Sequence, residues 1–119
     1  MKIVYASRMG HVEGIINRLG ITDAIKINDG TERIDGDYVL FTYNDGHGDI
    51  PKIVEAFLSV NDAPKAVAGS GSQQYHADTF NFATQKIADR YNIPVLAKMD
   101  MDGTDEDLES IRKGLVALN

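Results

Sequence analysis

The fold is decided by the stretch YVLFTYNDGHGDIP, residues Tyr38–Pro51. Its first part, Tyr38–Tyr43, is an uncharged and mostly apolar run, which is typical of a strand buried on both faces of a parallel sheet. The run ends in a polar loop that carries Gly46 and Gly48, and Pro51 then precedes an apolar pattern with helical spacing. Because glycine adopts backbone conformations that are costly for other residues, this loop predicts an unusual backbone path between a buried strand and a helix.

Apolar runs alternate with helical patterns along the rest of the chain. Strands are expected at residues 2–6, 24–27, 38–43, 65–70 and 94–101. Helices are expected where apolar residues recur at three and four positions: Val12, Ile15, Ile16 and Leu19; Ile50, Ile53, Val54, Phe57 and Leu58; Phe80, Ala83, Ile87, Ala88 and Tyr91; and Leu108, Ile111 and Leu115. This alternation predicts an α/β protein.

Local signals mark the ends of these helices. Pro51 fits the first turn of the second helix, where its missing N–H has no helical partner. The third helix is expected to stop before Pro94, and Thr104 with Asp107 forms the pattern of a capping box at the start of the last one. Residues Asn28–Asp37 are polar, contain two glycines and are too short for a crossover helix, so we expect a loop or a single turn there.

The order of these elements predicts one domain over residues 1–119. Buried strands separated by helices imply a parallel sheet covered on both faces. Five such strands suit the flavodoxin-like, doubly wound arrangement with strand order 2-1-3-4-5, here with the helix between strands 2 and 3 reduced. In sheets of this kind, ligands bind outside the carboxyl ends of the strands, near the point where the winding reverses.

Composition and charge exclude several classes of function. The formal net charge of -6 counts against nucleic-acid binding, which requires Lys and Arg to neutralise phosphates. The chain has no cysteine, so disulfides and thiolate sites are excluded and any redox activity needs a bound cofactor. We recognise no signal peptide and no apolar run long enough to span a bilayer, and therefore expect a cytoplasmic protein with no membrane partner.

Three polar loops are expected at the carboxyl edge of the sheet: Ser7–His11, Asn44–Asp49 and Ser70–Asp78. All three histidines of the chain lie in these loops. We expect no metal site, because carboxylate partners at a recognisable spacing are missing. We expect no hydrolase triad either, because AGSGSQ (residues 68–73) lacks the spacing of a nucleophile elbow.

Each loop allows a ligand-binding and a ligand-free interpretation. The backbone around Gly10 and the Ser7 hydroxyl suit a phosphate at a helix start, with Arg8 or His11 adding charge, and a plain capped turn is the alternative. The glycines of the second loop suit close approach to a flat ligand, or a glycine-rich turn without one. Tyr75 in the third loop suits stacking on a ring, or covering the end of the sheet.

Longer motifs resemble those of flavodoxin-type FMN proteins. TYNDGHGDIP (42–51) is similar to their Gly-x-Gly-x-x-Pro loop beside the flavin, and GSGSQQY (69–75) to their Gly-x-Gly loop followed by an aromatic residue. More narrowly, the chain resembles the NrdI family, small flavodoxins that work with class Ib ribonucleotide reductase. This resemblance covers nearly the whole chain and rests on TYNDGHGDIPKIVEAFL (42–58), on the short segment between strands 2 and 3, and on MDGTDEDLESIRKGL (101–115).

Two loops depart from the family pattern. Threonine is usual where this chain has Met9, and asparagine where it has His11, which leaves more of the phosphate binding to Ser7, Arg8 and backbone N–H groups. The third loop reads SGSQQYH (70–76) in place of Ser-Gly-Asn-Arg-Asn-aromatic-Gly and is followed by one extra residue. This changes the side chains available for flavin stacking and for partner contact.

The resemblance implies FMN as the cofactor, with its phosphate in the first loop and its ring between the second and third. The glycine loop would lie near flavin N5, where a peptide flip can follow the redox state. No catalytic side chain and no metal ligand is implied, because the chemistry belongs to the flavin. The implied FMN-binding residues are Ser7, Arg8, Met9, Gly10, His11, Val12, Thr42, Tyr43, Asn44, Asp45, Gly46, His47, Gly48, Ser70, Gly71, Ser72, Tyr75 and Asp78.

The resemblance also implies a redox accessory flavoprotein rather than a stand-alone metabolic enzyme. Reduced flavin would pass an electron to dioxygen, and the superoxide or related oxidant would activate the dimetal or radical site of a class Ib-type ribonucleotide reductase small subunit. A separate reductant, which the sequence does not identify, would reduce the flavin. The alternatives are a generic flavodoxin electron carrier for another oxidoreductase, and a flavin-free signalling module, which would need an acidic pair where Ala6-Ser7-Arg8 stands.

Overall fold

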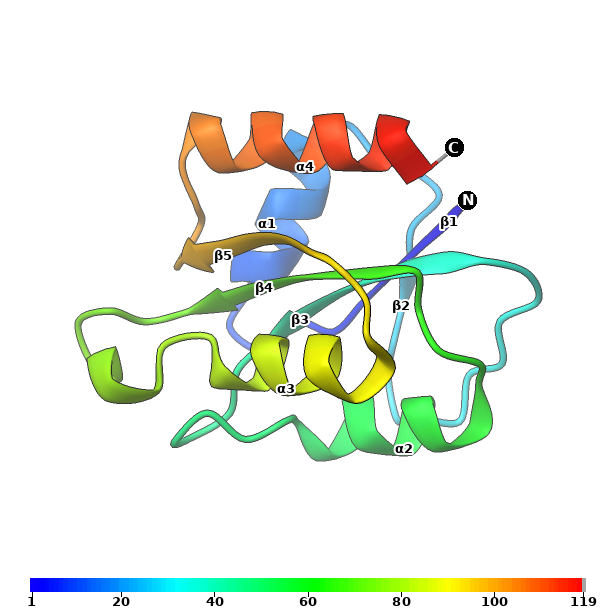
Figure 1. Cartoon of the computed structure of the whole chain (residues 1–119), viewed down its shortest axis with the longest axis horizontal. Helices are drawn as coiled ribbons and strands as arrows, with labels where there is room; N and C mark the ends of the chain where they lie inside the picture. Colours follow the sequence, from blue (N-terminus) through cyan, green and yellow to red (C-terminus); the bar gives the residue numbers. More distant parts are fainter. Residues whose placement is uncertain (119) are drawn as a thin grey trace.

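A computed structural model describes residues 1–118 and has one five-stranded sheet with helices on both faces (Figure 1). Its strands are β1 (Lys2–Tyr5), β2 (Ile25–Lys26), β3 (Tyr38–Tyr43), β4 (Ala66–Gly71) and β5 (Val95–Asp100). Its helices are α1 (His11–Arg18), α2 (Lys52–Val60), the short 3-10 helix η1 (Ala77–Thr79), α3 (Phe82–Tyr91) and α4 (Asp105–Leu118). Neighbouring strands are parallel, in the order β2-β1-β3-β4-β5, which confirms the predicted flavodoxin-like topology.

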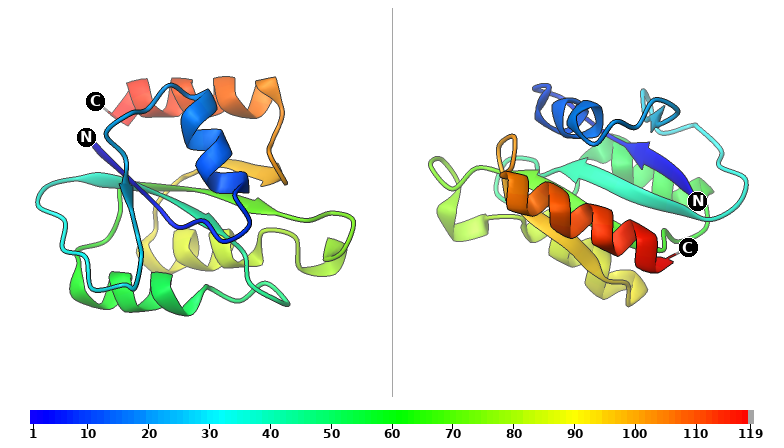
Figure 2. Two further views of the ribbon diagram at one scale, coloured as in Figure 1. Left: turned by 180° about the vertical axis from the view of Figure 1, so that it is seen from behind. Right: turned by 90° about the horizontal axis from the view of Figure 1, so that it is seen from above.

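The two faces of the sheet carry separate apolar layers. Helices α1 and α4 cover one face and α2 and α3 the other, which the views from behind and from above also show (Figure 2). Successive residues of β3 face opposite layers: Val39 and Phe41 pack with α1 and α4, whereas Tyr38 and Leu40 pack with α2 and α3. Burial on both sides explains why this strand has no polar alternation.

Most element boundaries lie within one or two residues of the expected ones. β1 ends at Tyr5 rather than Ala6, and Pro51 stands just before α2 instead of in its first turn. The larger difference is at α3: Phe80, expected on its buried face, precedes the helix, because Asn81 adopts a left-handed conformation with φ 55° between them. The short helix η1 was not expected.

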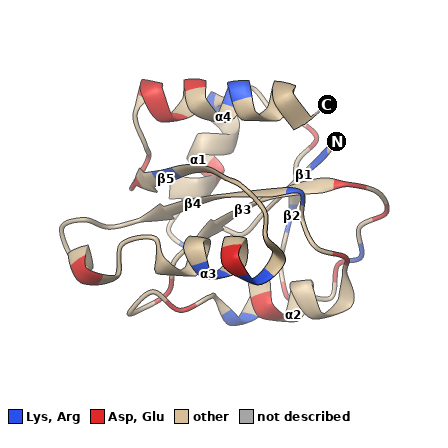
Figure 3. Ribbon diagram, viewed as in Figure 1, with Lys and Arg blue, Asp and Glu red and all other residues tan. Residues whose placement is uncertain are grey.

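The predicted capping box at α4 is confirmed. Thr104 Oγ1 accepts the N–H of Asp107 at 3.1 Å, and Asp107 Oδ2 accepts the N–H of Thr104 at 2.9 Å. Asp105 and Glu106 add negative charge to the same turn (Figure 3), where the helix dipole favours it. No helix in the described part of the chain is both long and apolar enough to cross a bilayer.

The segment between β2 and β3 forms a loop, as expected. The carboxylate of Glu32 accepts the backbone N–H groups of Asn28, Asp29 and Gly30 at 2.7, 3.3 and 3.0 Å. Desolvation opposes the charged carboxylate, but these hydrogen bonds outweigh it and lower the pKa of Glu32 below its ordinary value of 4.5. The Glu32 carboxylate therefore organises the first part of the loop that replaces the missing helix.

We predict that Glu32→Gln lowers the free energy of unfolding at neutral pH, because an amide cannot accept three backbone N–H groups. A group with a lowered folded pKa stabilises the protein above its unfolded pKa, and this stabilisation is lost as the pH falls through the folded value. The difference in unfolding free energy between wild type and variant, measured by urea denaturation, should therefore be smaller at about pH 3 than at neutral pH. Asp23→Asn, at an exposed turn, is the control. An equal difference in unfolding free energy at both pH values would contradict the stabilising role of the charged Glu32 carboxylate.

Candidate functional site

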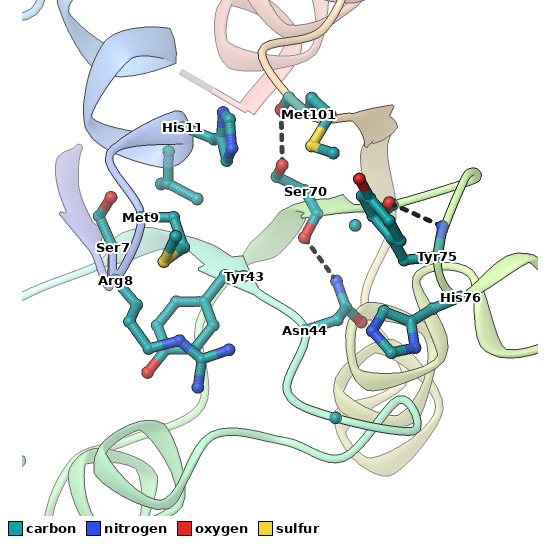
Figure 4. A pocket seen from close by; sticks show the side chains of 14 residues that line it. Ser7, Arg8, Met9, His11, Tyr43, Asn44, Ser70, Tyr75, His76 and Met101 are labelled. Carbon is teal, nitrogen blue, oxygen red and sulfur yellow. Dashed lines mark hydrogen bonds between the residues drawn. The ribbon is translucent and has the colours of Figure 1, made fainter.

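A cavity of about 360 Å³ opens at the carboxyl edge of the sheet, where the loops after β1, β3 and β4 meet (Figure 4). Its volume lies within the roughly 300–1,000 Å³ that is typical of small-molecule sites. The loop after β5 closes a further side. The cavity is lined by Ser7, Arg8, Met9, His11, Val12, Tyr43, Asn44, Gly46, Ser70, Gly71, Ser72, Tyr75, His76 and Met101.

One wall is the start of α1. Gly10 precedes the helix with φ 91°, a left-handed conformation that favours glycine. Ser7 Oγ accepts the backbone N–H of Glu13 at 3.2 Å and so satisfies one donor of the first turn. The N–H groups of His11 and Val12 have no acceptor among residues 1–118. Free donors at the positive end of a helix suit an anionic group.

The loop after β5 joins this wall. His11 Nδ1 lies 2.6 Å from Asp102 Oδ1, and Arg18 donates to the Asp102 carbonyl at 2.5 Å. Met101, with φ 53°, donates its N–H to the Gly71 carbonyl at 2.8 Å. These contacts hold the end of β5 against both α1 and β4.

Arg8 is engaged with the second loop rather than with the start of α1. Its guanidinium lies 2.7 Å from Asp45 Oδ1 and 5.0 Å from the centroid of the Tyr43 ring. In Figure 4 it lies beside Tyr43, whereas the His11 ring lies near Met101. Burial raises the pKa of the Tyr43 hydroxyl, Asp45 adds to the rise and Arg8 opposes it, so this hydroxyl stays neutral at physiological pH.

The two glycines of the second loop have different roles. The loop closes on itself because Asp45 and Asp49 exchange backbone hydrogen bonds, both at 2.9 Å. Gly48 has φ 88°, and a Cβ there would stand 2.6 Å from Phe82 Cβ, so its lack of a side chain lets the loop pack against the start of α3. Gly46 has φ 41°, lines the cavity, and would meet nothing within 4 Å. Gly48 therefore serves packing, and Gly46 faces the ligand space.

The Asn44 side chain connects the second loop to the third and to α3. Its Oδ1 accepts the backbone N–H groups of Ala83 and Thr84 at 2.8 and 3.2 Å, which caps α3 from a distant part of the chain. Its Nδ2 donates to the Ser70 carbonyl at 3.0 Å and to Asn81 Oδ1 at 2.9 Å. All the hydrogen-bonding capacity of this amide is thus used at the base of the cavity.

Asn81 completes this network in the interior. It is fully buried, and its Nδ2 donates to the Met99 carbonyl at 3.1 Å. Its Oδ1 also accepts the hydroxyl of Thr84 at 2.9 Å. A Cβ on Gly69 would lie only 1.7 Å from the Thr84 hydroxyl oxygen, so this strand glycine is required by the network. Sequence reasoning missed Asn81 and Thr84, because their spacing carries no motif.

The third loop presents an aromatic side chain to the cavity. Ser72 Oγ accepts the N–H of Tyr75 at 3.1 Å, and the Ser72 carbonyl accepts the N–H of His76 at 3.0 Å. The Tyr75 side chain is 70% exposed and lies along the cavity in Figure 4. The rings of His76 and His47 are perpendicular, with centroids 6.2 Å apart. No group of three or more His, Asp or Glu side chains in residues 1–118 is arranged to hold a metal ion.

The structure brings most of the predicted binding residues to one cavity. Six of the predicted binding residues do not line the cavity: Gly10, Thr42, Asp45, His47, Gly48 and Asp78. Thr42 is fully buried and turns its hydroxyl to the Tyr43 carbonyl, and Asp78 lies in η1, away from the cavity. Two lining residues were not predicted, His76 and Met101. Met101 directly follows a parallel strand, and this position is a signal that could have indicated it.

Comparison with known proteins identifies the family. The sequence model of the family described as NrdI Flavodoxin like matches residues 3–113. The chain belongs to the NrdI flavodoxin-like family. The predicted recognition is thereby confirmed, and the cavity lies at the edge where the three family-like loops converge.

Two relatives named Protein NrdI are similar in sequence to this chain over most of its length. Protein NrdI of Bacillus licheniformis is 33% identical over 110 residues, which cover 92% of this chain and 82% of the relative. Protein NrdI of a Ruegeria species is 31% identical over 121 residues, which cover 95% of this chain and 86% of the relative.

Solved structures agree with the fold. A flavodoxin of Streptococcus pneumoniae TIGR4 superimposes with a TM-score of 0.69 at 22% identity and covers 99% of this chain and 98% of its own. Oxidised Flavodoxin 2 from Bacillus cereus gives a TM-score of 0.62 at 20% identity and covers 98% of this chain and 97% of its own. At these identities the likeness concerns the fold.

We predict that Asn44→Ala lowers the free energy of unfolding by about 2–3 kcal/mol, because two helix N–H groups and the side-chain oxygen Oδ1 of Asn81 lose a partner. Urea denaturation monitored by circular dichroism measures the change. Asn17→Ala, on the exposed side of α1, is the matched control and should stay within about 0.5 kcal/mol of the wild type. Equal stability of the two variants would contradict the structural role of Asn44.

Proposed function

We propose that this NrdI-family protein binds FMN in the cavity and uses it to reduce dioxygen, so that superoxide or a related oxidant activates a class Ib-type ribonucleotide reductase small subunit. The observation that carries the proposal is the convergence of three loops, one of them at a helix start with free backbone N–H groups, on a single cavity. Family membership favours this function over a generic electron carrier or a flavin-free signalling module.

The start of α1 suits the phosphate of FMN. The backbone N–H groups of His11 and Val12 are free donors there, and Ser7 adds a hydroxyl within the same wall. Methionine replaces the usual threonine at position 9, so backbone donors carry more of this role. The negative end of the cofactor would thus meet a fixed, preorganised set of dipoles.

The remaining walls suit a flat aromatic ring. Tyr75 offers an exposed ring for stacking from the third loop, and Gly46 leaves the opposite loop without a side chain. Asn44 holds these two loops at a fixed separation through Ser70 and α3. The protein would therefore hold the ring between the second loop, which the Asn44 hydrogen bonds fix in place, and the exposed side chain of Tyr75.

When bound in this cavity, reduced FMN would supply the redox chemistry, the transfer of one electron to dioxygen. The protein contributes position, electrostatics and a route to the partner. A separate electron donor is required to reduce the flavin again. The site itself offers no thiol that could replace it, because the chain has no cysteine.

The opening of the cavity suits a protein partner. Met9 and Tyr75 flank it and are 76% and 70% exposed, although both side chains are largely apolar. Exposed apolar groups beside a functional cavity are typical of docking surfaces. The net charge of -6 also suits a partner with a basic docking face. We propose the reductase small subunit as this partner.

The test combines the reduced, FMN-loaded protein, dioxygen and a manganese-loaded class Ib small subunit. We expect an oxidised metal centre or a tyrosyl radical, measured by electron paramagnetic resonance, and ribonucleotide reduction once the large subunit is added. Free reduced FMN at the same concentration is the control and should activate far less, because it does not dock.

Formation of a yellow FMN complex without activation of the small subunit would contradict the partner assignment and favour a generic electron carrier. A protein that takes up no FMN would contradict the cofactor assignment as well.

A further inference from the structure

Resting on the proposed FMN site, we infer that His11, held by Asp102, is the side chain through which this protein selects a phosphorylated flavin over riboflavin. Neither residue lies in a motif that indicates this pairing, and they are far apart in the sequence. The structure brings them within 2.6 Å of each other at the wall formed by the start of α1.

His11 is the basic side chain on the anion-binding wall. Its ring lines the cavity, and its own backbone N–H is one of the free donors of the first turn. The other basic lining residues are placed elsewhere: Arg8 is paired with Asp45 beside Tyr43, and His76 belongs to the third loop. A phosphate at the start of α1 therefore meets the imidazole of His11 before any other cationic side chain.

The hydrogen bond to Asp102 fixes which atoms of the ring are used. An ionised carboxylate only accepts hydrogen bonds, so His11 Nδ1 carries the hydrogen in this pair. Nε2 has no partner among residues 1–118 and is left for a ligand. A phosphate oxygen also acts as an acceptor, so it binds Nε2 only when that nitrogen is protonated too. The ring is thus placed between two hydrogen-bond acceptors, the Asp102 carboxylate at Nδ1 and a phosphate oxygen at Nε2.

The negative charge of Asp102 also opposes the binding of an anionic ligand. Its carboxylate is 66% exposed and lies near the same wall, so without His11 it would repel a phosphate. With His11 present, the carboxylate is paired with Nδ1 and orients the ring. The sign of the effect of Asp102 on FMN affinity should therefore depend on whether His11 is present.

The experiment measures dissociation constants for FMN and riboflavin by quenching of flavin fluorescence, in the full-length protein. His11→Ala should weaken FMN binding roughly tenfold or more, the scale of a lost hydrogen bond to a charged group, and leave riboflavin binding unchanged. His11→Lys keeps a cation at the helix start and should retain most of the preference for FMN. Riboflavin affinity serves as the internal check that the cavity is intact.

A double-mutant cycle tests the pairing itself. Asp102→Asn should weaken FMN binding in the wild-type background and strengthen it in the His11→Ala background. Asp105→Asn removes the same charge three residues further along the chain, at a side chain that pairs with Arg18 and not with His11, and is the matched control. It should change FMN affinity in the same direction in both backgrounds.

The outcomes separate this inference from the proposed function. If wild type binds FMN tightly but His11→Ala keeps the full preference over riboflavin, the role of His11 is wrong and the FMN site stands. If His11→Ala weakens the binding of FMN and riboflavin equally, the ring maintains the shape of the cavity and does not recognise the phosphate. If Asp102→Asn strengthens FMN binding in both backgrounds, the pairing is wrong. If wild type binds neither flavin, the proposed function and this inference both fail.

Discussion

The half-buried side-chain amide of Asn44 is the constraint on which the cavity depends. It caps α3, holds the end of β4 through the Ser70 carbonyl, and contacts Asn81, which in turn reaches β5. Such a network is stabilising only when every member is satisfied, and no buried side-chain polar atom in the described residues lacks a partner. The second and third loops are thereby fixed relative to each other before any ligand binds, and such preorganisation favours binding.

The remaining wall is held by charges that are largely exposed. Arg8 with Asp45 and His11 with Asp102 each join segments that are distant in the sequence, but these pairs are open to solvent and contribute little stability by themselves. Their value lies in orientation, because each one fixes a side chain at the rim of the cavity. The protein thus combines a base of neutral hydrogen bonds with a rim of partly exposed side-chain pairs.

Much of the fold follows from the sequence because its signals are local. The strand Tyr38–Tyr43 has its predicted limits, since burial on both faces leaves an uncharged and mostly apolar run, and the capping box at Thr104 needs only neighbouring residues. The site was predictable where it follows the ends of strands. The roles of Asn44 and Gly48 were not, because both depend on contacts with α3 that only the folded chain brings together. The pairing of His11 with the loop after β5 is long-range in the same way.

The central claim is that three loops at one edge of the sheet bind FMN together. The most direct test is an FMN titration of the isotopically labelled protein, followed by the backbone amide signals in two-dimensional NMR. We predict saturation at one FMN per chain, with the largest shifts at residues 8–13, 43–48 and 70–76. No shifts, or shifts concentrated on helices away from this edge, would contradict the account.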